Sequence, residues 1–474
     1  MTNAIRVLVE HYNITSGIIL SSQIIDDQEV VNPVDIADLG YSHKEQIDIL
    51  SLLQNFKLNN QTCLLNNVDI KCPKCASKTY KYGMRKSKFH AVLTDHEVSI
   101  QRVRCTCGWV SESTVEGIYG TSVHPELLEK QLKQSAEYSY RKAKTSLNAE
   151  SLNERAINNT ERLRRTVAIA ASVIEKERLA DQTEVKEERA AKELIVVIDG
   201  GHIKSNIKDS RSFEAMIGSV FKPESLVFVD KHHNEIIQKT SVASALSDDQ
   251  RTIKQLVLNA CKKEGINSKI TKLTCLTDGA NNCWSITKTL KSHCKELEQI
   301  LDWFHVTKRF TVIRNSINDE LKDSLDEVKW CLWHGNHQKA LLKINELIAI
   351  VGTDKLTKLL QELSEYLERN KVYLVNYQEK ASNSLPYTST YAEVSVNSII
   401  NIRQKCNQKM QWSRQGAHDV LQLRTSIFSK TWKNDMNTVK MGLYKHKKKK
   451  KYFSVALTKQ IFSIILKVEK TVVL

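Results

Sequence analysis

The sequence predicts a multidomain α/β protein whose largest part is a strand-and-helix domain over residues 190–440. The chain has 474 residues, which is too long for one ordinary core. Only 15 Gly and 5 Pro interrupt it, so helix should dominate. After residue 190, short apolar runs alternate with helical patterns, which is typical of an α/β sheet.

The charge distribution indicates a polyanionic partner, with nucleic acid the first candidate. The formal net charge is +16. Residues 1–70 hold 3 Lys/Arg and 9 Asp/Glu, a net charge of −6, which leaves +22 for the remainder. A merely basic enzyme with another substrate is the alternative at this point. The 11 scattered cysteines and the lack of a signal-peptide pattern favour a reducing, cytoplasmic compartment, and no apolar run is long enough to span a membrane.

The first two segments differ in how much they reveal. Residues 1–60 read as an α/β or helical region of unknown role. Residues 61–115 contain two cysteine pairs, Cys72 with Cys75 and Cys105 with Cys107. Four thiolates in two tight turns are a typical structural Zn²⁺ site, so this segment is predicted to be a zinc ribbon. The second pair has one intervening residue where two are usual, and four buried or free thiols remain the alternative.

Residues 116–180 are predicted to be helical and similar to a helix-turn-helix. Two helical stretches, Leu127–Leu147 and Glu154–Glu175, are separated by a short break. Polar residues on the second stretch suit base edges and phosphates, and the candidates for DNA contact are Asn158, Arg162, Arg164 and Arg165. A plain helical spacer with solvated arginines is the alternative. A charged stretch over residues 174–193 then favours a domain boundary.

Within residues 190–440 the expected elements alternate between strands and helices. The strands are expected at Leu194–Ile198, Glu214–Phe221, Ser225–Asp230, Lys272–Leu276 and Gln299–Trp303. Helices are expected near 248–264 and 284–297. Residues 306–385 show no strand pattern and are predicted to form a mainly helical insertion. Another helix is expected to begin near Glu393.

Two aspartates follow apolar strands in this domain. Asp199 follows Leu194–Ile198, and the glycines after it would let the backbone turn and a large substrate approach. Asp278 follows a second apolar run in the same way. Carboxylates at the ends of neighbouring strands can share two divalent cations, which is what phosphoryl transfer requires. An Asp-Gly pair taken alone is more often a plain turn.

The linked motifs resemble the DDE transposases of bacterial insertion sequences, of the Mutator-like group. They are Asp199-Gly200-Gly201-His202, Thr277-Asp278-Gly279-Ala280, Leu301-Asp302-Trp303-Phe304-His305, Glu393-Val394-Ser395-Val396-Asn397, Arg403-Gln404-Lys405, Met410-Gln411-Trp412-Ser413 and Leu423-Arg424-Thr425. The resemblance covers residues 190–430. It implies an RNase H-like catalytic core with the helical insertion between Asp278 and Glu393.

The resemblance also implies an activity and a set of site residues. The activity is metal-dependent hydrolysis at the ends of a mobile element, followed by strand transfer into target DNA. Asp199, Asp278 and Glu393 would be the catalytic residues and would hold two Mg²⁺ or Mn²⁺ ions. Glu365 and Glu379 are alternative third acids, but neither precedes the rest of the motif.

Further residues of these motifs have open roles. Asp302 and His305 would support the active site or the DNA ends, or form ordinary hydrogen bonds at a strand end. Trp412 and Arg403 are candidates for DNA contact, with a core position equally open for Trp412. His202 could touch a phosphate. Trp330 and Trp333 are expected in the core of the insertion.

The resemblance and the charge together imply the partners. The chain would bind terminal repeats and target DNA and would act as a homodimer or larger assembly, near the bacterial nucleoid. The alternatives are a decayed, catalytically inactive DNA-binding protein and a nuclease that cuts without joining. Residues 441–474 form a basic tail, with the run Lys447–Lys451, that departs from the family and is either abnormal or an ordinary DNA-contacting end.

Overall fold

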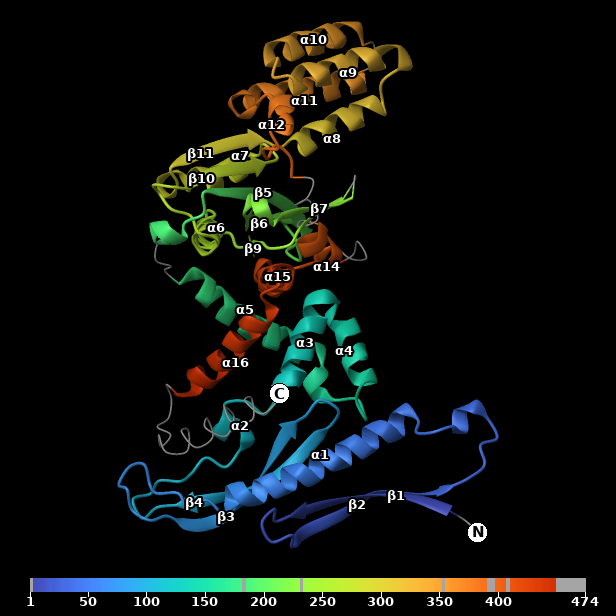
Figure 1. Cartoon of the computed structure of the whole chain (residues 1–474), viewed down its shortest axis with the longest axis vertical. Helices are drawn as coiled ribbons and strands as arrows, with labels where there is room; N and C mark the ends of the chain where they lie inside the picture. The colour runs from blue at the N-terminus through green and yellow to red at the C-terminus, as the bar shows by residue number, and fades with distance from the viewer. Residues whose placement is uncertain are drawn as a thin grey trace. The chain divides into compact units, whose positions relative to one another are not determined.

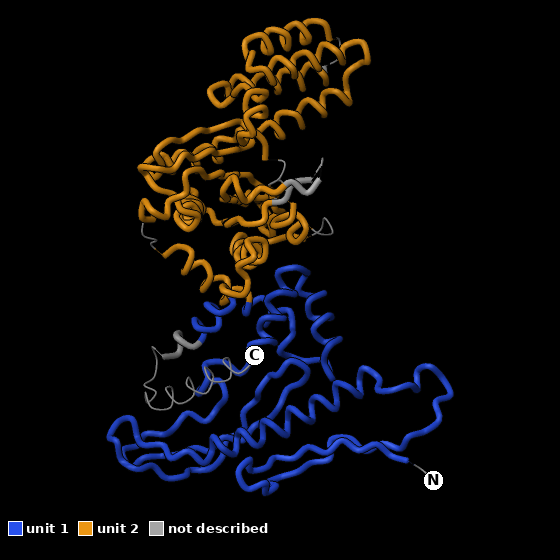
Figure 2. Tube along the Cα trace, in the orientation of Figure 1, with its two compact units in different colours: residues 1–166, 436–474 blue, residues 167–435 orange. Residues whose placement is uncertain are grey.

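The computed structural model describes residues 3–180, 185–230, 233–351, 354–389, 397–405 and 410–448. The chain divides into two compact units, one of residues 1–166 with 436–474 and one of residues 167–435 (Figure 2). The divisions fall within helices α5 (Thr160–Leu179) and α16 (Trp432–Lys448). Within the described ranges, no helix is both long enough and apolar enough to cross a membrane.

The first unit begins with a hairpin and a long helix. Strands β1 (Asn3–Tyr12) and β2 (Ile19–Val30) pair antiparallel through a turn in which Gly17 takes a φ of 71°. Helix α1 (His43–Asn66) begins at Ser42, whose hydroxyl accepts from the Glu45 N–H while the Glu45 side chain accepts from the Ser42 N–H. This region, predicted only as α/β or helical, is therefore a β-hairpin followed by one helix.

The two cysteine pairs flank a second hairpin. Strands β3 (Tyr80–His90) and β4 (Asp95–Arg104) pair antiparallel between them. Val98 and Ile100 of β4 alternate with exposed residues and form a small core with Val115, the first residue of α2 (Val115–Tyr119). The hairpin thus carries one cysteine pair before its first strand and the other after its second.

The helical segment of the first unit consists of three helices and one 3-10 turn. The predicted stretch Leu127–Leu147 is divided into α3 (Pro125–Glu137) and α4 (Tyr140–Ala149), because the Ser139 side chain accepts from the Lys142 N–H and starts a new helix. The turn Ala156–Asn158 then precedes α5. The break that the sequence predicted near Asn148 is present, at the end of α4.

The second unit contains a five-stranded mixed sheet in the order β11-β10-β5-β6-β9 (Figure 1). Strand β6 (Ser212–Phe221) pairs antiparallel with both β5 (Glu193–Lys204) and β9 (Thr240–Ser244). Strands β10 (Lys272–Thr277) and β11 (Glu296–Leu301) are parallel to β5. The sheet therefore has an antiparallel half and a parallel half that meet at β5.

Two expectations about this sheet need correction. The segment predicted as the third strand forms β7 (Leu226–Asp230), which pairs with β8 (His233–Ile236) in a separate hairpin. The third strand of the sheet is β9, a short Thr-Ser-Val-Ala-Ser segment without an apolar run. The helix predicted at 284–297 is also shorter, since α7 (Asn281–Lys288) ends early and Glu296 already pairs with Lys272 in the sheet.

Both faces of the sheet are covered. Leu194, Val196 and Ile198 of β5 face a core shared with α6 (Arg251–Glu264) and α7. Ile195 and Val197 face the opposite core, which includes residues of the helical insertion. This double burial explains why the central strand reads as one continuous apolar run.

The insertion is helical, as predicted. It contains α8 (Trp303–Arg314), α9 (Asp319–Trp333), α10 (His337–Ile350), α11 (Asp354–Arg369) and α12 (Tyr377–Ser382). Trp333 packs near Tyr377, with ring centroids 6.4 Å apart, but Trp330 is 59% exposed. The expectation of a core position is therefore wrong for Trp330. After the insertion, a π-helical turn (Asn397–Asn401), α14 (Ile402–Gln404) and α15 (Arg414–Phe428) complete the unit.

Candidate functional site

The parallel pairing of β5 and β10 brings two aspartates together. Ile198 lies opposite Thr277 in the register, so the next residues along the two strands are Asp199 and Asp278. Both strands run in the same direction, and both carboxylates therefore leave the sheet at the same level. Asp199 continues the face of Ile195 and Val197, which is the face that the insertion covers.

A turn follows Asp278, as expected, but no turn follows Asp199. Asp278 is followed by a turn, in which Gly279 has a φ of 89° and Ala280 N–H donates to Asp278 Oδ1 at 2.9 Å. Strand β5, in contrast, continues past Asp199 to Lys204, because it stays paired with β6. The expected turn at Gly200 is therefore absent. The Glu214 carboxylate lies over this glycine, with Oε1 2.5 Å from the position that a Cβ would take.

Asp302 and His305 connect the start of α8 to this site. Asp302, 1% exposed, accepts from Phe304 N–H at 3.0 Å and from Ser389 N–H at 2.8 Å, and it also accepts from the Ser389 hydroxyl. His305 Nε2 lies 3.7 Å from Asp302 Oδ2 and 4.0 Å from Asp199 Oδ2. Asp302 thus caps α8, while His305 stands between two acids.

Burial makes the carboxyl groups of Asp199 and Asp302 costly to ionise. Burial is the largest cause that raises the pKa of Asp199; Asp278 and Asp302 raise it further, and His305 opposes the shift. Burial likewise raises the pKa of Asp302. Burial and then the negative charge of Asp278 raise the pKa of the Cys283 thiol, with smaller contributions from Asp199 and Glu214. A divalent cation placed among these groups would offset their repulsion.

Glu393, the predicted third acid, lies outside the described residues. Glu365 and Glu379, the alternative acids, are exposed on α11 and α12. Tyr366, the next residue after Glu365, faces the Asp278 turn, so Glu365 points elsewhere on the helix.

Three residues near the site were missed by sequence reasoning. Glu214 accepts from the Asn282 side-chain amide and, as described, covers Gly200. Tyr366 and Asn370 of the insertion contact the Asp278 turn. Glu214 left a signal, an acid inside an otherwise apolar strand. Tyr366 and Asn370 left none, because their position depends on how the insertion folds back.

The four cysteines of the first unit form a compact cluster. Their Sγ atoms all lie within 4.8 Å of one another, with Cys72 to Cys107 at 3.5 Å and Cys75 to Cys105 at 3.4 Å. Four thiolates around Zn²⁺ at about 2.3 Å stand roughly 3.8 Å apart, so the cluster fits this ion. Hydrogen bonds from Ser77 lower the pKa of Cys75 to about 6, which favours the ligating thiolate.

The ligand atoms of this cysteine cluster lie closer to one another than those of the acidic site. Among the described residues, no other group of three His, Cys, Asp or Glu side chains brings its ligand atoms so close together. The cysteines are preorganised by local turns: Ala76 N–H donates to Cys72 O at 2.8 Å, and Gly108 takes a φ of 86° beside Cys107. The cluster can therefore hold a structural zinc ion without rearrangement.

The predicted DNA-contacting residues of α5 are exposed, but Asn158 is not. Arg162, Arg164 and Arg165 lie on the surface, and the last two pair with Glu161 at 2.9 Å. Asn158 is fully buried; it accepts from Gln131 at 2.9 Å and donates to Asn148 at 3.0 Å. The prediction that Asn158 contacts a DNA base is therefore wrong. Its side-chain amide instead links Gln131 of α3 to Asn148 of α4.

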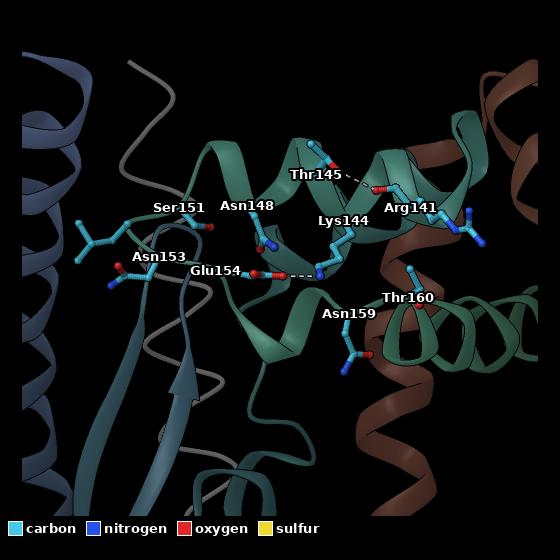
Figure 3. Close-up of a pocket in the computed structure, with 10 residues that line it drawn as sticks. Arg141, Lys144, Thr145, Asn148, Ser151, Asn153, Glu154, Asn159 and Thr160 are labelled. Carbon is cyan, nitrogen blue, oxygen red and sulfur yellow. Dashed lines mark hydrogen bonds and ion pairs between the residues drawn. The ribbon is translucent and has the colours of Figure 1, made fainter.

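A polar pocket lies beside these residues, between α4 and the start of α5 (Figure 3). Arg141, Lys144 and Thr145 line it from α4, and Asn159 and Thr160 line it from the other side. Lys144 pairs with Glu154 across it. The side chains around it are mostly polar or charged, and they include the acidic Glu154 as well as Arg141 and Lys144.

Arg403 and Trp412 are also buried. The Arg403 guanidinium carbon lies 4.8 Å from the Trp412 ring centroid, and the two residues are 1% and 7% exposed. The Trp412 indole donates to Gln404 O at 3.2 Å, and its backbone pairs with the segment that follows β5. The expected DNA contacts of this pair are corrected, and the core position is the one observed for Trp412. His202, in contrast, is exposed and lies opposite Glu214 in the sheet.

Comparison with known proteins gives a distant structural likeness. No protein-family model matches the chain, and the comparison with curated proteins found no match. Among solved structures, the Drosophila P element transposase strand transfer complex aligns with 65% of this chain and 92% of that chain, at 10% identity and a TM-score of 0.27. A likeness at this level carries no argument about function, which must come from the site itself.

Proposed function

We propose that the chain is a DDE-type DNA transposase that cuts the ends of a mobile element and transfers them into target DNA. The observation that carries the proposal is the placement of Asp199 and Asp278 at the same level of adjacent parallel strands. The motifs that resemble Mutator-like transposases of bacterial insertion sequences begin with these two residues.

The strand order supports an RNase H-like core. Such a core has three antiparallel strands, followed by two strands that are parallel to the first and lie on its other side. The sheet order β11-β10-β5-β6-β9 has this form. The first strand and the fourth then carry the two acids, as the resemblance implies.

The donor set fits hard divalent cations. Asp199 and Asp278 offer carboxylate oxygens, the ligands that Mg²⁺ and Mn²⁺ prefer, and Glu393 would supply the third acid. Two such ions, when bound, stabilise the attacking and leaving oxygens of a phosphodiester. His305 lies 4.0 Å from Asp199 and 3.7 Å from Asp302, the residue that caps α8. It would orient the Asp199 carboxylate.

DNA would be the partner both for recognition of the element's ends and for cleavage and strand transfer. The cysteine cluster, with Zn²⁺, and helix α5, which carries Arg162, Arg164 and Arg165, would bind the element's terminal repeats. The pocket beside them would accept backbone phosphates. Since a mobile element has two ends, we infer a homodimer or larger assembly on DNA.

The test is Mg²⁺-dependent cleavage of the element's end DNA by the native chain, by Asp278→Ala and by Asp319→Ala. Asp319 is an exposed acid of the insertion with a side chain 91% accessible, so its replacement controls for the loss of one charge. We expect cleavage by the native chain and the control, with a loss of at least about a thousandfold in Asp278→Ala.

The opposite results are equally informative. Equal cleavage by native chain and Asp278→Ala would reject the carboxylate site. Specific binding of end DNA without cleavage by any variant would favour the second candidate, a decayed transposase that only binds DNA.

A further inference from the structure

The Asp278 turn is enclosed by the helical insertion and the end of β11. Gly279 leaves no room for a side chain: a Cβ there would lie 2.8 Å from Leu301 Cδ1, 2.9 Å from Asn370 Nδ2 and 3.0 Å from Tyr366 Cε2. Two of these neighbours belong to the insertion, at the end of α11 and just after it. The turn therefore takes its shape against residues about 90 positions further along the chain.

Tyr366 makes a direct hydrogen bond to this turn. Its hydroxyl donates to the Asp278 carbonyl oxygen at 2.9 Å, and the residue is 2% exposed. Arg309 of α8 packs on the Tyr366 ring, with its guanidinium carbon 3.9 Å from the ring centroid. The Tyr366 ring is thus fixed within the insertion and its hydroxyl is fixed on the turn.

Asn370 holds the element that follows the turn. Its side-chain oxygen accepts from the Trp284 indole N–H at 2.9 Å, and its amide nitrogen donates to Tyr366 O at 2.9 Å. Trp284 lies on α7, six positions after Asp278, and stacks on Tyr373 with ring centroids 3.8 Å apart. Asn370 is 1% exposed, so these bonds do not exchange with solvent.

We propose that Tyr366 and Asn370 are positioning residues through which the helical insertion sets the orientation of the Asp278 carboxylate. This inference rests on the proposed function, because Tyr366 and Asn370 have a positioning role only if Asp199 and Asp278 bind a cation. Neither residue touches the cation or the DNA. Each acts through the backbone of the turn, and the insertion thereby tunes cation affinity from outside the sheet.

The chain offers a matched control. Tyr377, also in the insertion and fully buried, donates its hydroxyl to Leu301 O at 2.8 Å. Tyr366→Phe and Tyr377→Phe each remove one buried hydroxyl from the insertion and one hydrogen bond to a strand end. Only the first of these bonds ends on an acid of the proposed cation site. A general effect on stability would therefore be similar in both variants, and a positioning effect would not.

The experiment measures Mn²⁺ binding to the full-length, zinc-loaded chain by the electron paramagnetic resonance signal of free Mn²⁺. Native chain, Tyr366→Phe, Tyr377→Phe and Asp278→Ala are compared, with circular dichroism to confirm folding. We expect Tyr366→Phe to bind Mn²⁺ about tenfold more weakly and Tyr377→Phe to bind as the native chain does. The Mg²⁺ concentration for half-maximal cleavage should rise by the same factor in Tyr366→Phe, with the rate at saturating Mg²⁺ near the native rate.

Two negative results are distinguishable. If the native chain binds Mn²⁺ more tightly than Asp278→Ala, but Tyr366→Phe binds as the native chain or as Tyr377→Phe, only the positioning role is overturned. If the native chain binds no more tightly than Asp278→Ala, the cation site is absent, and the proposed function falls together with this inference.

Discussion

Asn158 shows how burial changes the role of a polar residue. We expect Asn158→Ala to lower the free energy of unfolding of the first unit by about 1–3 kcal/mol, because Gln131 and Asn148 would each lose a buried partner. Urea denaturation followed by circular dichroism measures this change. DNA affinity of the folded variant should equal that of the native chain, and a selective loss of DNA binding with native stability would restore the original prediction.

Arg162 is the matched exposed residue on the same segment. If it contacts a phosphate, Arg162→Ala should leave stability within about 0.5 kcal/mol of native and should reduce the salt slope of DNA binding by about 1. Fluorescence anisotropy at several salt concentrations gives that slope. An unchanged slope would mean that the arginine is only solvated.

Asp95 carries a prediction about pH. Burial alone would raise the pKa of Asp95, but hydrogen bonds from His90 and from the buried Arg155 lower it to about 2. A carboxyl with a folded pKa below its unfolded value of about 3.9 stabilises the fold above that pH and loses this contribution as the pH falls towards 2. The urea midpoint of the first unit should therefore fall between about pH 4 and pH 2.

The substitution Asp95→Asn checks the cause. It should be less stable than the native chain at neutral pH, and its urea midpoint should change less over this acid range. Asp27→Asn, which removes an exposed ion pair with Arg6, should keep the native pH dependence. An equally steep acid dependence in Asp95→Asn would assign the effect to other carboxyls.

Exposure explains which single residues could be predicted. The acids Asp199 and Asp278 were found because their strands are continuous apolar runs, a local signal. The sequence offered no such signal for Asn158, Arg403 and Trp412, which were expected at DNA and are buried. A polar or aromatic residue in a helical pattern has the same sequence appearance on a DNA-facing surface and inside a core.

Among the elements, the β3–β4 hairpin carries the clearest prediction. We expect the native chain to contain about one zinc ion at the cysteine cluster, measured by atomic absorption, because four thiols already lie at ligand spacing. Cys72→Ser should lose most of this zinc and expose the β3–β4 amides to hydrogen exchange, since metal binding supplies folding free energy.

The control for the zinc prediction is Cys63→Ser. Cys63 is exposed on α1 and is not part of the cluster. It should keep both the zinc and the amide protection. Protection of β3 and β4 that survives zinc removal would show that the small Val98–Ile100–Val115 core holds the hairpin without metal.

The elements that escaped prediction share one cause. Strand β9 consists of small and polar residues, yet all five are buried, because it pairs with β6 and lies under α15. The segment at Ser225–Asp230 has the stronger strand pattern but pairs outside the sheet. Sequence pattern predicts that a segment is extended, whereas its partner depends on contacts distant in the chain.

The motif after Glu393 has a structural meaning at this level. Arg424 of α15 donates to Ile399 O at 2.6 Å and also to Ser398 O, in the π-helical turn that begins at Asn397. Arg403 lies over Trp412 a few residues later. These contacts fix the described backbone from Asn397 onward. Arg403, Trp412 and Arg424 are therefore buried residues that stabilise this part of the second unit.

The charge of the whole chain leads to a further prediction. Residues 71–474 carry a net charge of +22 against −6 for residues 1–70. Binding of end DNA should weaken steeply with salt, with a slope of log affinity against log salt of about −0.9 for each phosphate neutralised. Filter binding between 50 and 200 mM salt measures it. A flat response would indicate that DNA is not the partner of the basic surface.

The order of segments along the chain was accessible from sequence, since the cysteine pairs, the helical stretch, the apolar strands and the strandless insertion each have a local pattern. The sequence did not predict which of these segments contact one another in the folded chain. The contacts of Tyr366 and Asn370 with the Asp278 turn depend on the path of five helices. Such contacts can be seen only in three dimensions, and they surround the candidate site.

The distance along the chain between Asp278 and Tyr366 also has a consequence for biosynthesis. At 5–20 residues per second, a ribosome needs roughly 4–18 s to add the 88 positions between the aspartate and the tyrosine that bonds to it. Strand β11 (Glu296–Leu301) is made early in that interval, and from then on all five sheet strands are present, but the turn after β10 still lacks Tyr366 and Asn370. A nascent chain would therefore pass through a stage in which both aspartates are present and the second is still free to move. Slow translation of the insertion would lengthen this stage, and the Asp278 turn would gain its hydrogen bond from Tyr366 only when α11 folds back.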